Sequence, residues 1–404
     1  MISYFKSQIP NIKLKRTLHP STIAIRTQTE RTSQKEHSTP LFLTSSFVFD
    51  SAEDMRAAFA DETHDNIYSR YSNPTVDEFA HKMALLEKCE AGFAVASGMA
   101  AVFSSFMALL KNGDHLLCCR SMFGGTNTVV TKFLTRFGIE YSMVDIDDID
   151  NWDSAIQPNT KMLYVETPTN PQLELIDLEK AGLLCKKHNI IFNVDNCFAT
   201  PFLQTPADFG ADLVIHSATK WLDGQGRVLG GVVTGKKDLI HQIYLFCRNS
   251  GPALSPFNAW VLTKSLETLD LRIQKHSENA LQVAKALEKN SNIEWVKYPF
   301  LPSHPQYDIA KKQMSAGGGI VCFEIKGGIK AGRKFMDALE ILSLTPNLGD
   351  ARSIASHPAS TTHSKLSDEE RLKVGITPGL IRISVGLEHV EDIIYDIEQA
   401  LSKS

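Results

Sequence analysis

The stretch LVIHSATKWLDGQGRVLGG, residues 213–231, places a lysine directly after an apolar, strand-like run. The run 213–215 leads into His-Ser-Ala-Thr-Lys, and a glycine-rich loop follows Lys220. Burial disfavours an ammonium group, so it lowers the pKa of a lysine and makes the amine a better nucleophile. Such a lysine can hold a carbonyl cofactor as a Schiff base. We predict this role for Lys220; the alternative is a strand-end lysine that reaches solvent.

Strand-like and helix-like segments alternate around this stretch. The apolar runs lie at 93–97, 115–119, 139–145, 161–166, 190–195, 213–217 and 230–234. Helical patterns lie between most of them, for example at 99–110, 126–137 and 178–188. The alternation predicts an α/β fold with a mostly parallel sheet of about seven strands, covered by helices on both faces. Ligands of such sheets bind beyond the carboxyl ends of the strands.

The length of 404 residues favours two domains over one. We expect an N-terminal arm, a large domain that carries the sheet, and a smaller α/β C-terminal domain, at residues 1–60, 61–257 and 258–404. The elements expected outside the sheet are helices at 52–60, 74–87, 258–290 and 390–401, an extended segment at 39–49, and strands at 320–325 and 381–385.

Composition excludes several classes of protein. Hydrophobic residues make up 43% and charged residues 22%, which is typical of a soluble globular protein. A net charge of −4 gives no reason to expect nucleic acid or an anionic membrane as partner. The seven cysteines form no CxxC pair, so we expect neither a metal cluster nor disulfides, and we place the protein in the reducing cytoplasm.

Two segments have alternative interpretations. Residues 93–110 contain no charge and reach the lower length limit of a membrane helix. Because Ser97-Gly98 interrupts the run, a strand, a turn and a buried helix explain it better. Residues 1–29 carry five basic residues and no acid, without the apolar core of a secretory signal. A flexible basic arm is the favoured interpretation, and a transit peptide is the alternative.

Polar residues at the strand ends suggest a single site. Asp195 ends an apolar run, and a carboxylate there can pair with a protonated pyridine nitrogen; a capping aspartate is the alternative. Asn170 lies in a loop fixed by two prolines and could reach a ring hydroxyl, or the loop is an ordinary rigid turn. Arg382 stands in a half-buried strand and could bind a substrate carboxylate, unless it forms a structural salt bridge.

A phosphate site is predicted where the run 93–97 turns into a helix. The amides at such a helix start point outward at the positive end of the helix dipole. The candidate residues of this site are Ser97, Gly98, Met99, Ser217 and Thr219. Together with Lys220, Asp195 and Arg382, they have the chemistry of a pyridoxal phosphate (PLP) enzyme that acts on an amino acid.

The sequence resembles the Cys/Met-metabolism family of PLP enzymes from about residue 22 to the end. The motifs that carry the resemblance are YSRYSNPT (68–75), SGMAA (97–101), ETPTNP (166–171), VDN (194–196), SATKWLDGQGRVLGG (217–231), GPALSPFNAW (251–260) and IRISVGLE (381–388). The wording of EHSTPLFLTSSFVF (36–49), VDNCFATP (194–201) and HPASTTH (357–363) is most similar to the O-succinylhomoserine sulfhydrylase branch. The resemblance implies the aspartate-aminotransferase-like type I fold and a homotetramer built from two dimers.

The resemblance also implies roles for individual residues. Lys220 would carry the cofactor, Asp195 would pair with its pyridine nitrogen, and Asn170 would contact the ring 3-oxygen and the substrate. Arg382 would bind the substrate α-carboxylate. Tyr68 and Arg70 would reach the phosphate of the neighbouring subunit, so that the site would be shared across a dimer.

Three positions depart from the family pattern. Many members have a tyrosine where this chain has Phe123, which can stack on the ring but cannot exchange a proton. Lys220 would then perform most proton transfers. Asn347 stands where we expect a serine near the cofactor and substrate. Arg352 stands where many members carry a glutamate; it could favour an anionic substituent such as succinate, or form a surface salt bridge.

The implied reaction is a γ-replacement: O-succinyl-L-homoserine and sulfide give L-homocysteine and succinate in methionine biosynthesis. The alternatives are a cystathionine γ-synthase and a γ-lyase of methionine or cystathionine. The sequence does not settle the acyl group of the ester or the choice between sulfide and cysteine as sulfur donor.

Overall fold

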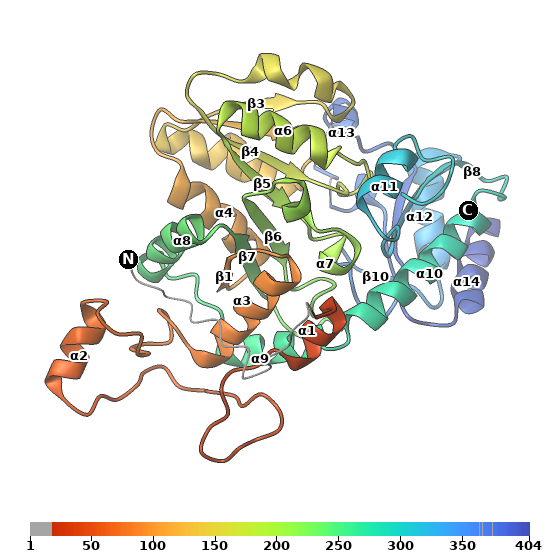
Figure 1. The fold of residues 1–404 in the computed structure, drawn as a ribbon. Helices are drawn as coiled ribbons and strands as arrows, with labels where there is room; N and C mark the ends of the chain where they lie inside the picture. The colour runs from red at the N-terminus through yellow and green to blue at the C-terminus, as the bar shows by residue number, and fades with distance from the viewer. Residues whose placement is uncertain (1–17, 363, 366, 374) are drawn as a thin grey trace.

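The computed structural model describes residues 18–362, 364–365, 367–373 and 375–404. Residues 91–235 contain a seven-stranded sheet with the strand order β1-β7-β6-β5-β4-β2-β3 (Figure 1). Its strands are β1 (Ala91–Val95), β2 (His115–Cys119), β3 (Glu140–Val144), β4 (Thr160–Glu166), β5 (Ile191–Asp195), β6 (Leu213–Ser217) and β7 (Gly231–Gly235). Each lies at a predicted run.

The sheet is mostly parallel, as predicted. Strands β6, β5, β4, β2 and β3 are parallel to one another. Strand β7 is antiparallel to both β6 and β1. Because β5 and β6 share one direction and pair side by side, their carboxyl ends bring Asp195 and the segment after Ser217 to the same edge.

Helices cover both faces of this sheet. On one face, α4 (Gly98–Leu109) and α8 (Lys237–Ser250) pack on side chains such as Val95, Ile215 and Val233. On the other, α3 (Pro74–Leu86) and α6 (Leu178–His188) pack on side chains such as Ala94 and Phe192. Alternate residues of each strand therefore belong to different cores, which explains the nearly continuous apolar runs. Residues 93–110 form the end of β1, a turn and α4, as predicted.

The predicted helix at 126–137 is irregular. It consists of α5 (Gly124–Thr128), one π-helical turn (Val129–Phe133) and one 3-10 turn (Leu134–Phe137). The remaining short elements of this part are η3 (Ile146–Ala155), α7 (Thr200–Leu203) and η4 (Pro206–Phe209).

A second, five-stranded sheet has the order β10-β11-β12-β9-β8. Its strands are β8 (Ile293–Lys297), β9 (Ile320–Ile325), β10 (Ser343–Leu344), β11 (Ile354–Ser356) and β12 (Leu380–Ser384). Its other elements are α11 (Tyr307–Gln313), α12 (Gly328–Ala338), η5 (Pro358–Ser360), α13 (Asp368–Lys373) and α14 (Val390–Ser402). The two predicted strands correspond to β9 and β12, and the predicted last helix to α14.

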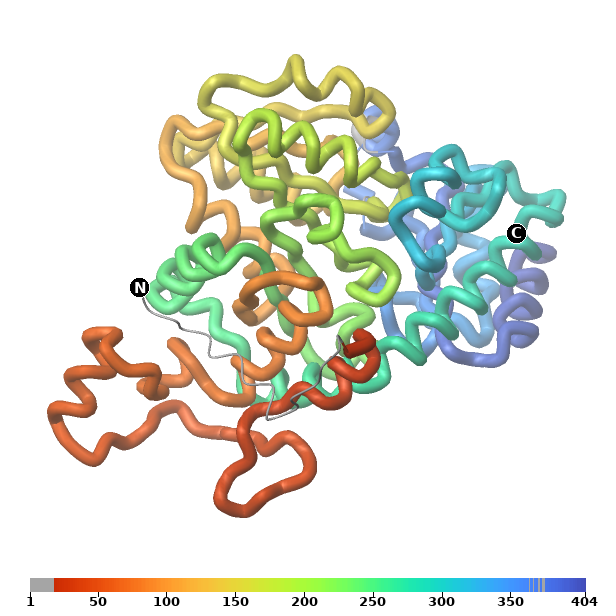
Figure 2. Tube along the Cα trace, viewed as in Figure 1, coloured from red at the N-terminus to blue at the C-terminus, as the bar shows by residue number. Residues whose placement is uncertain are grey.

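The predicted single helix 258–290 is divided into α9 (Pro256–Leu266) and α10 (Leu269–Leu287). The carbonyl oxygen of Ser265 accepts hydrogen bonds from the Thr268 amide at 3.2 Å and from Arg272 Nη2 at 3.0 Å, so it does not continue the helical ladder. Helix α10 then leads from the first sheet towards the second (Figure 2). The division into a large and a smaller domain at 257/258 stays a prediction, and the two sheets lie on either side of it.

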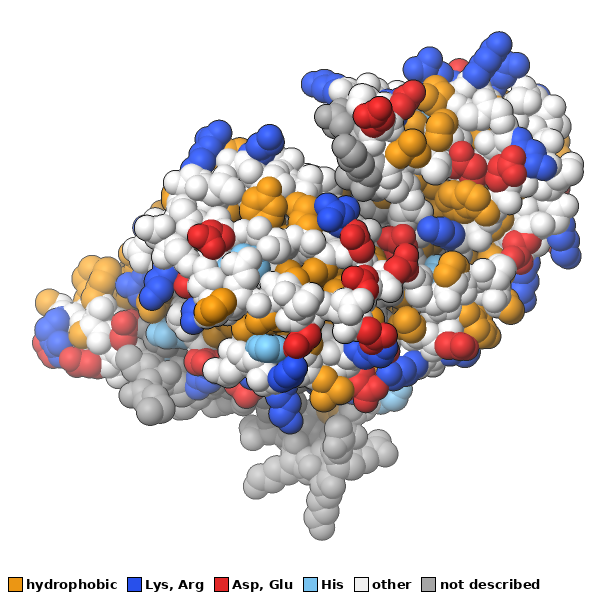
Figure 3. Space-filling model, turned by 90° about the horizontal axis from the view of Figure 1, so that it is seen from above, with side chains coloured by type: hydrophobic (Ala, Val, Ile, Leu, Met, Phe, Trp, Pro, Cys, Tyr) orange, Lys and Arg blue, Asp and Glu red, His pale blue; other side chains and the backbone are white. Residues whose placement is uncertain are grey.

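The N-terminal part includes α1 (Pro20–Arg26) and α2 (Ala52–Phe59), and α2 projects away from the sheets in Figure 1. Residues 39–49 lie outside helices, and their contacts with the rest of the chain include a bridge between Ser46 and Tyr68 and hydrogen bonds to α3. The predicted basic arm falls largely on residues 1–17, which lie outside the described residues. Among the described helices, none is long and apolar enough to cross a membrane. On the face shown in Figure 3, acidic and basic side chains are interspersed.

Candidate active site

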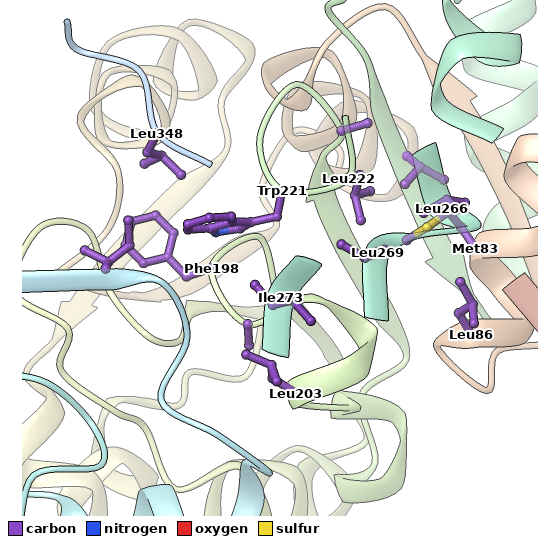
Figure 4. Close-up of a cluster of buried hydrophobic side chains, with 14 of the residues drawn as sticks. Met83, Leu86, Phe198, Leu203, Trp221, Leu222, Leu266, Leu269, Ile273 and Leu348 are labelled. Atoms are coloured by element: carbon purple, nitrogen blue, oxygen red, sulfur yellow. The ribbon is translucent and has the colours of Figure 1, made fainter. Parts of the chain in front are cut away.

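Lys220 follows β6 and is held by its neighbour in the chain. The amide of Lys220 donates to the Ser217 carbonyl at 3.2 Å, and Trp221 is completely buried. The Trp221 ring lies among Phe198, Leu348 and other apolar side chains (Figure 4). The buried ring fixes the backbone beside the lysine, so Lys220 is half-buried with its amine near Asn347.

The amine of Lys220 has a neutral partner. Its Nζ atom donates a hydrogen bond to Oδ1 of Asn347 at 2.5 Å. Burial lowers the pKa of Lys220, and the nearby Arg382 lowers this pKa further. The surroundings of the lysine therefore favour the neutral, nucleophilic form of the amine.

Asp195 is the last residue of β5 and lies in the same region. Its Oδ1 accepts the Cys197 amide at 3.0 Å, and its Oδ2 accepts the Tyr164 hydroxyl at 3.2 Å. Burial raises the pKa of Asp195, while these hydrogen bonds and the nearby His216 act in the opposite direction. The Cys197 contact is the local capping bond of the alternative interpretation, but it does not occupy the second oxygen.

Glu166 is a buried carboxyl group that the sequence analysis did not select. It ends β4 and pairs in register with Asp195 on β5. Burial and the neighbouring Asp195 raise the pKa of Glu166 to about 8. Its two oxygens accept the amides of Phe123, at 2.8 Å, and Asn170, at 3.0 Å. The available signal was its position at a strand end, the same signal that marked Asp195.

The predicted phosphate residues lie around the start of α4. Ser97 caps this helix, since its Oγ accepts the Ala100 amide at 3.1 Å. Gly98 touches β6 so closely that a Cβ there would lie 2.6 Å from the Cβ of Ser217. The Thr219 hydroxyl accepts the Gly230 amide at 3.2 Å. This close approach joins outward-pointing amides to a strand that ends in a hydroxyl, which suits a phosphate group.

Arg382 is 93% buried on β12 and has three oxygen partners. Its Nη1 donates to Oδ1 of Asn170 at 2.9 Å. Its Nη2 donates to the carbonyl oxygens of Pro346, at 3.1 Å, and Asn347, at 3.0 Å. Within the described part of the chain, these partners are uncharged and the buried Nε atom has none. The structural salt bridge of the alternative interpretation is therefore not what holds this side chain, and a buried guanidinium of this kind suits an anionic ligand.

Phe123 is 45% exposed at the start of α5. A Cβ at Gly125 would lie 2.7 Å from the Phe123 ring and 3.1 Å from Sδ of Met99. The ring and the thioether thus border the same glycine, near the phosphate residues. The Phe123 ring carries no group that could exchange a proton.

Three other candidates lie in different surroundings. Tyr68 pairs with Ser46, and Arg70 donates to the carbonyl oxygen of Arg248 at the end of α8. The role of Tyr68 and Arg70 in a neighbouring subunit stays a prediction. Arg352 is exposed and forms an ion pair with Asp350 at 3.3 Å, as in the surface salt bridge of the alternative interpretation.

The residues that the structure brings together fit the predicted cofactor. They offer an amine of lowered pKa, a carboxyl group held by Cys197 and Tyr164, a helix start packed closely on β6 at Gly98, and a buried cation. A family model described as Cys/Met metabolism PLP-dependent enzyme matches residues 21–402. The chain belongs to this family. Pyridoxal phosphate is therefore its cofactor, and its fold is the type I fold of PLP enzymes.

Several characterised relatives are similar over most of the chain. An O-succinylhomoserine sulfhydrylase of Pseudomonas aeruginosa is 46% identical over 94% of this chain and 94% of its own length. One of Mycobacterium tuberculosis is 43% identical over 95% of both chains. An L-methionine gamma-lyase of Fusobacterium nucleatum is 43% identical over 90% of this chain and 93% of its own length.

Solved structures agree in fold. A candidate O-acetylhomoserine (thiol)-lyase of Campylobacter jejuni, which contains an N′-pyridoxyl-lysine-5′-monophosphate, is 36% identical, has a TM-score of 0.91 and covers 95% of this chain and 100% of its own. The metB protein of Corynebacterium glutamicum is 33% identical, has a TM-score of 0.89 and covers 96% of this chain and 98% of its own.

Proposed function

We propose that the protein is an O-succinylhomoserine sulfhydrylase: it joins sulfide to the γ-carbon of O-succinyl-L-homoserine and releases L-homocysteine and succinate. The observation that carries the proposal is Phe123 at the site, combined with relatives of this activity at 46% and 43% identity. A γ-lyase that relies on a tyrosine at this position would lack its proton-transfer group here. Because gamma-lyases are similar at 43% identity, the γ-lyase reaction is the second candidate.

The residues divide the work of this reaction. Bound pyridoxal phosphate supplies the aldehyde that takes up the substrate amine and the ring that accepts electrons from Cα. Asp195, held by Cys197 and Tyr164, has the position of a partner for the pyridine nitrogen. Gly98, Ser217 and Thr219 would hold the phosphate. Phe123 would stack on the ring and limit the access of water.

Proton transfers are assigned to Lys220. Its lowered pKa favours the neutral amine, which is needed to take a proton from Cα. Asn347 orients this amine through the 2.5 Å hydrogen bond. Arg382 binds the α-carboxylate of the substrate and fixes the Cα–H bond relative to Lys220. After handing on the α-proton, Lys220 takes a proton from Cβ, and the electron pair of that bond forms a Cβ=Cγ double bond as the Cγ–O pair leaves with succinate. Sulfide (HS⁻) then adds at Cγ, and protons return to Cβ and Cα, which gives the thiol of homocysteine.

We further propose a homotetramer of two dimers in the cytoplasm. Tyr68 is exposed and pairs with Ser46, and the half-buried Arg70 contacts the end of α8. A second copy of the chain would place them at the phosphate of the neighbouring site. Arg70→Ala should then weaken cofactor retention without changing the fold, as followed by the visible absorbance of the protein after dialysis.

Product analysis tests the proposed reaction. The purified holoenzyme is supplied with O-succinylhomoserine and either sulfide, cysteine or no acceptor, and separately with methionine alone. Homocysteine with sulfide is the expected main product, and Lys220→Ala should abolish it. Cystathionine as the main product with cysteine would favour the γ-synthase, and 2-oxobutyrate with ammonia from methionine would favour the γ-lyase. The same panel with the O-acetyl and O-phospho esters identifies the acyl group.

A further inference from the structure

We propose that Glu166 is a positioning residue of the site: its carboxyl group joins Phe123 to Asn170 and, through Asn170, sets the position of Arg382. The proposal rests on the proposed function only in that the ligand is an α-amino acid. Glu166 ends β4, whereas Phe123 lies in the loop after β2 and Asn170 in the loop after β4. One side chain thus connects both loops.

Each oxygen of Glu166 accepts one backbone amide. Oε2 accepts the Phe123 amide at 2.8 Å, and Oε1 accepts the Asn170 amide at 3.0 Å. A carboxyl group offers two acceptor oxygens at once, whereas the amide of glutamine offers one acceptor and turns an N–H group towards the other amide. The Glu166 side chain therefore fits this place in a way that glutamine does not.

The connection continues into the second sheet. Oδ1 of Asn170 accepts Nη1 of Arg382 at 2.9 Å. Nη2 of the same guanidinium donates to the Asn347 carbonyl at 3.0 Å, and the Asn347 side chain accepts Lys220 at 2.5 Å. A chain of hydrogen bonds thus runs from Glu166 through Arg382 to the amine of Lys220. A shift of Asn170 would move the cation that binds the substrate.

The burial of Glu166 favours a role other than stability. The residue is 5% exposed and lies beside a second carboxyl group, that of the half-buried Asp195. Burying two adjacent carboxyl groups costs folding free energy. Such a pair is therefore expected where the carboxyl groups serve a function. The two loops that Glu166 joins both carry residues of the site, so the geometry is used for ligand binding.

The test compares Glu166→Gln with a matched control, Asp396→Asn, in the holoenzyme. Asp396 is also a buried carboxylate that accepts backbone amides, those of residues 340–342, but it belongs to α14. The dissociation constant of L-norvaline, an α-amino acid without a leaving group, is measured from the change in cofactor absorbance. We expect it to rise about tenfold or more in Glu166→Gln, because one of the two backbone amides loses its acceptor and faces an N–H group. Asp396→Asn should leave it unchanged and lower only the melting temperature.

A double-mutant cycle with Asn170→Ala identifies the route. If Glu166 acts through Asn170, the effects of the two substitutions on norvaline binding should add up to clearly more than the effect of the double variant. Additive effects, or an unchanged dissociation constant in Glu166→Gln, would overturn the proposal. If Glu166→Gln does not fold, Glu166→Asp keeps both oxygens on a shorter side chain and must also weaken norvaline binding. Because norvaline binding needs no sulfide, these results do not depend on whether the sulfhydrylase reaction is found.

Discussion

The Nζ atom of Lys220 lies 2.5 Å from Oδ1 of Asn347, and the backbone carbonyl of Asn347 accepts a hydrogen bond from Arg382 at 3.0 Å. One residue of the loop before β11 therefore contacts both the amine of Lys220, which follows β6 of the first sheet, and the cation of Arg382 in the second sheet. The distance between base and substrate carboxylate depends on this loop.

Asn347→Asp should raise the pKa of Lys220. Burial lowers this pKa in the native protein. A carboxylate at hydrogen-bond distance stabilises the protonated amine and should raise the pKa by about one or more. Acylation of Lys220 in the cofactor-free protein, followed by mass spectrometry, should therefore begin at higher pH. Asn347→Ser, which adds no charge, is the control. An unchanged pH profile in Asn347→Asp would show that the two side chains do not interact in solution.

Gly98→Ala should weaken cofactor binding. The added Cβ would lie 2.6 Å from Cβ and 2.9 Å from Cα of Ser217, so α4 and β6 must move apart where the phosphate is held. We expect a loss of retention of about tenfold or more, and a loss of stability of about 1–3 kcal/mol. Gly92→Ala is a matched control, because its Cβ would lie 2.5 Å from the Ala80 carbonyl oxygen, away from the site. It should reduce stability alone; equal loss of cofactor from both variants would contradict the assignment.

Arg382→Lys should impair substrate binding while the cofactor stays bound. Lysine keeps the charge but cannot donate to Asn170 and to the carbonyls of residues 346 and 347 in one plane. KM for the homoserine ester should rise about a hundredfold, as for loss of charged hydrogen bonds. An amine that lacks the α-carboxylate serves as control and should bind both proteins equally. A lower affinity for this amine as well would mean that Arg382 supports the site in general.

Glu87→Ala should lower the stability of the protein, because it removes the buried hydrogen bonds of Glu87 with Asn196 and His216. Oε1 of the buried Glu87 accepts Nδ2 of Asn196 at 2.9 Å and lies 2.5 Å from Nε2 of His216. Removing the carboxylate leaves both buried donors without this acceptor, which costs about 3 kcal/mol of unfolding free energy. Glu87→Gln keeps one acceptor oxygen and should cost less. Urea denaturation of the holoenzyme measures the difference, and equal effects of the two substitutions would contradict this account.

The strands that could be predicted from the sequence are those whose apolar runs are buried on both faces, such as β4 and β6. The prediction did not include β8, whose five residues IEWVK carry two charges and are only partly buried, or β10, which has two residues. The break between α9 and α10 depends on Arg272, whose side chain reaches the Ser265 carbonyl at 3.0 Å. The spacing of apolar residues along the sequence does not predict this side-chain contact.

The residues of the candidate site could likewise be predicted only in part. Lys220 and Asp195 stand at strand ends, where their position alone indicates a ligand edge. The contact of Asn347 with Lys220 joins residues that are 127 positions apart, and it requires the packing of the second sheet on the first. Glu166 was part of a selected motif, but its two amide partners become visible only when the loops of Phe123 and Asn170 are folded around it.

The stability of the cofactor-free protein should decrease with rising pH because of Glu166. The pKa of this residue is raised from 4.5 to about 8 by burial and by Asp195, so the folded protein retains a proton that the unfolded chain releases. The stabilising contribution is complete below pH 4.5 and is lost as pH rises towards 8. Glu166→Gln is neutral throughout and removes this loss. From about pH 5 to about pH 8.5, the melting temperature of the native protein should therefore fall relative to that of Glu166→Gln.

Asp396→Asn is the control for this prediction. The pKa of Asp396 is lowered despite burial, because backbone amides stabilise its charge. The difference in melting temperature between the native protein and Asp396→Asn should therefore be constant over this pH range. A constant difference for Glu166→Gln as well would show that the carboxyl group is already ionised at pH 5 and is held as an anion by the two amides.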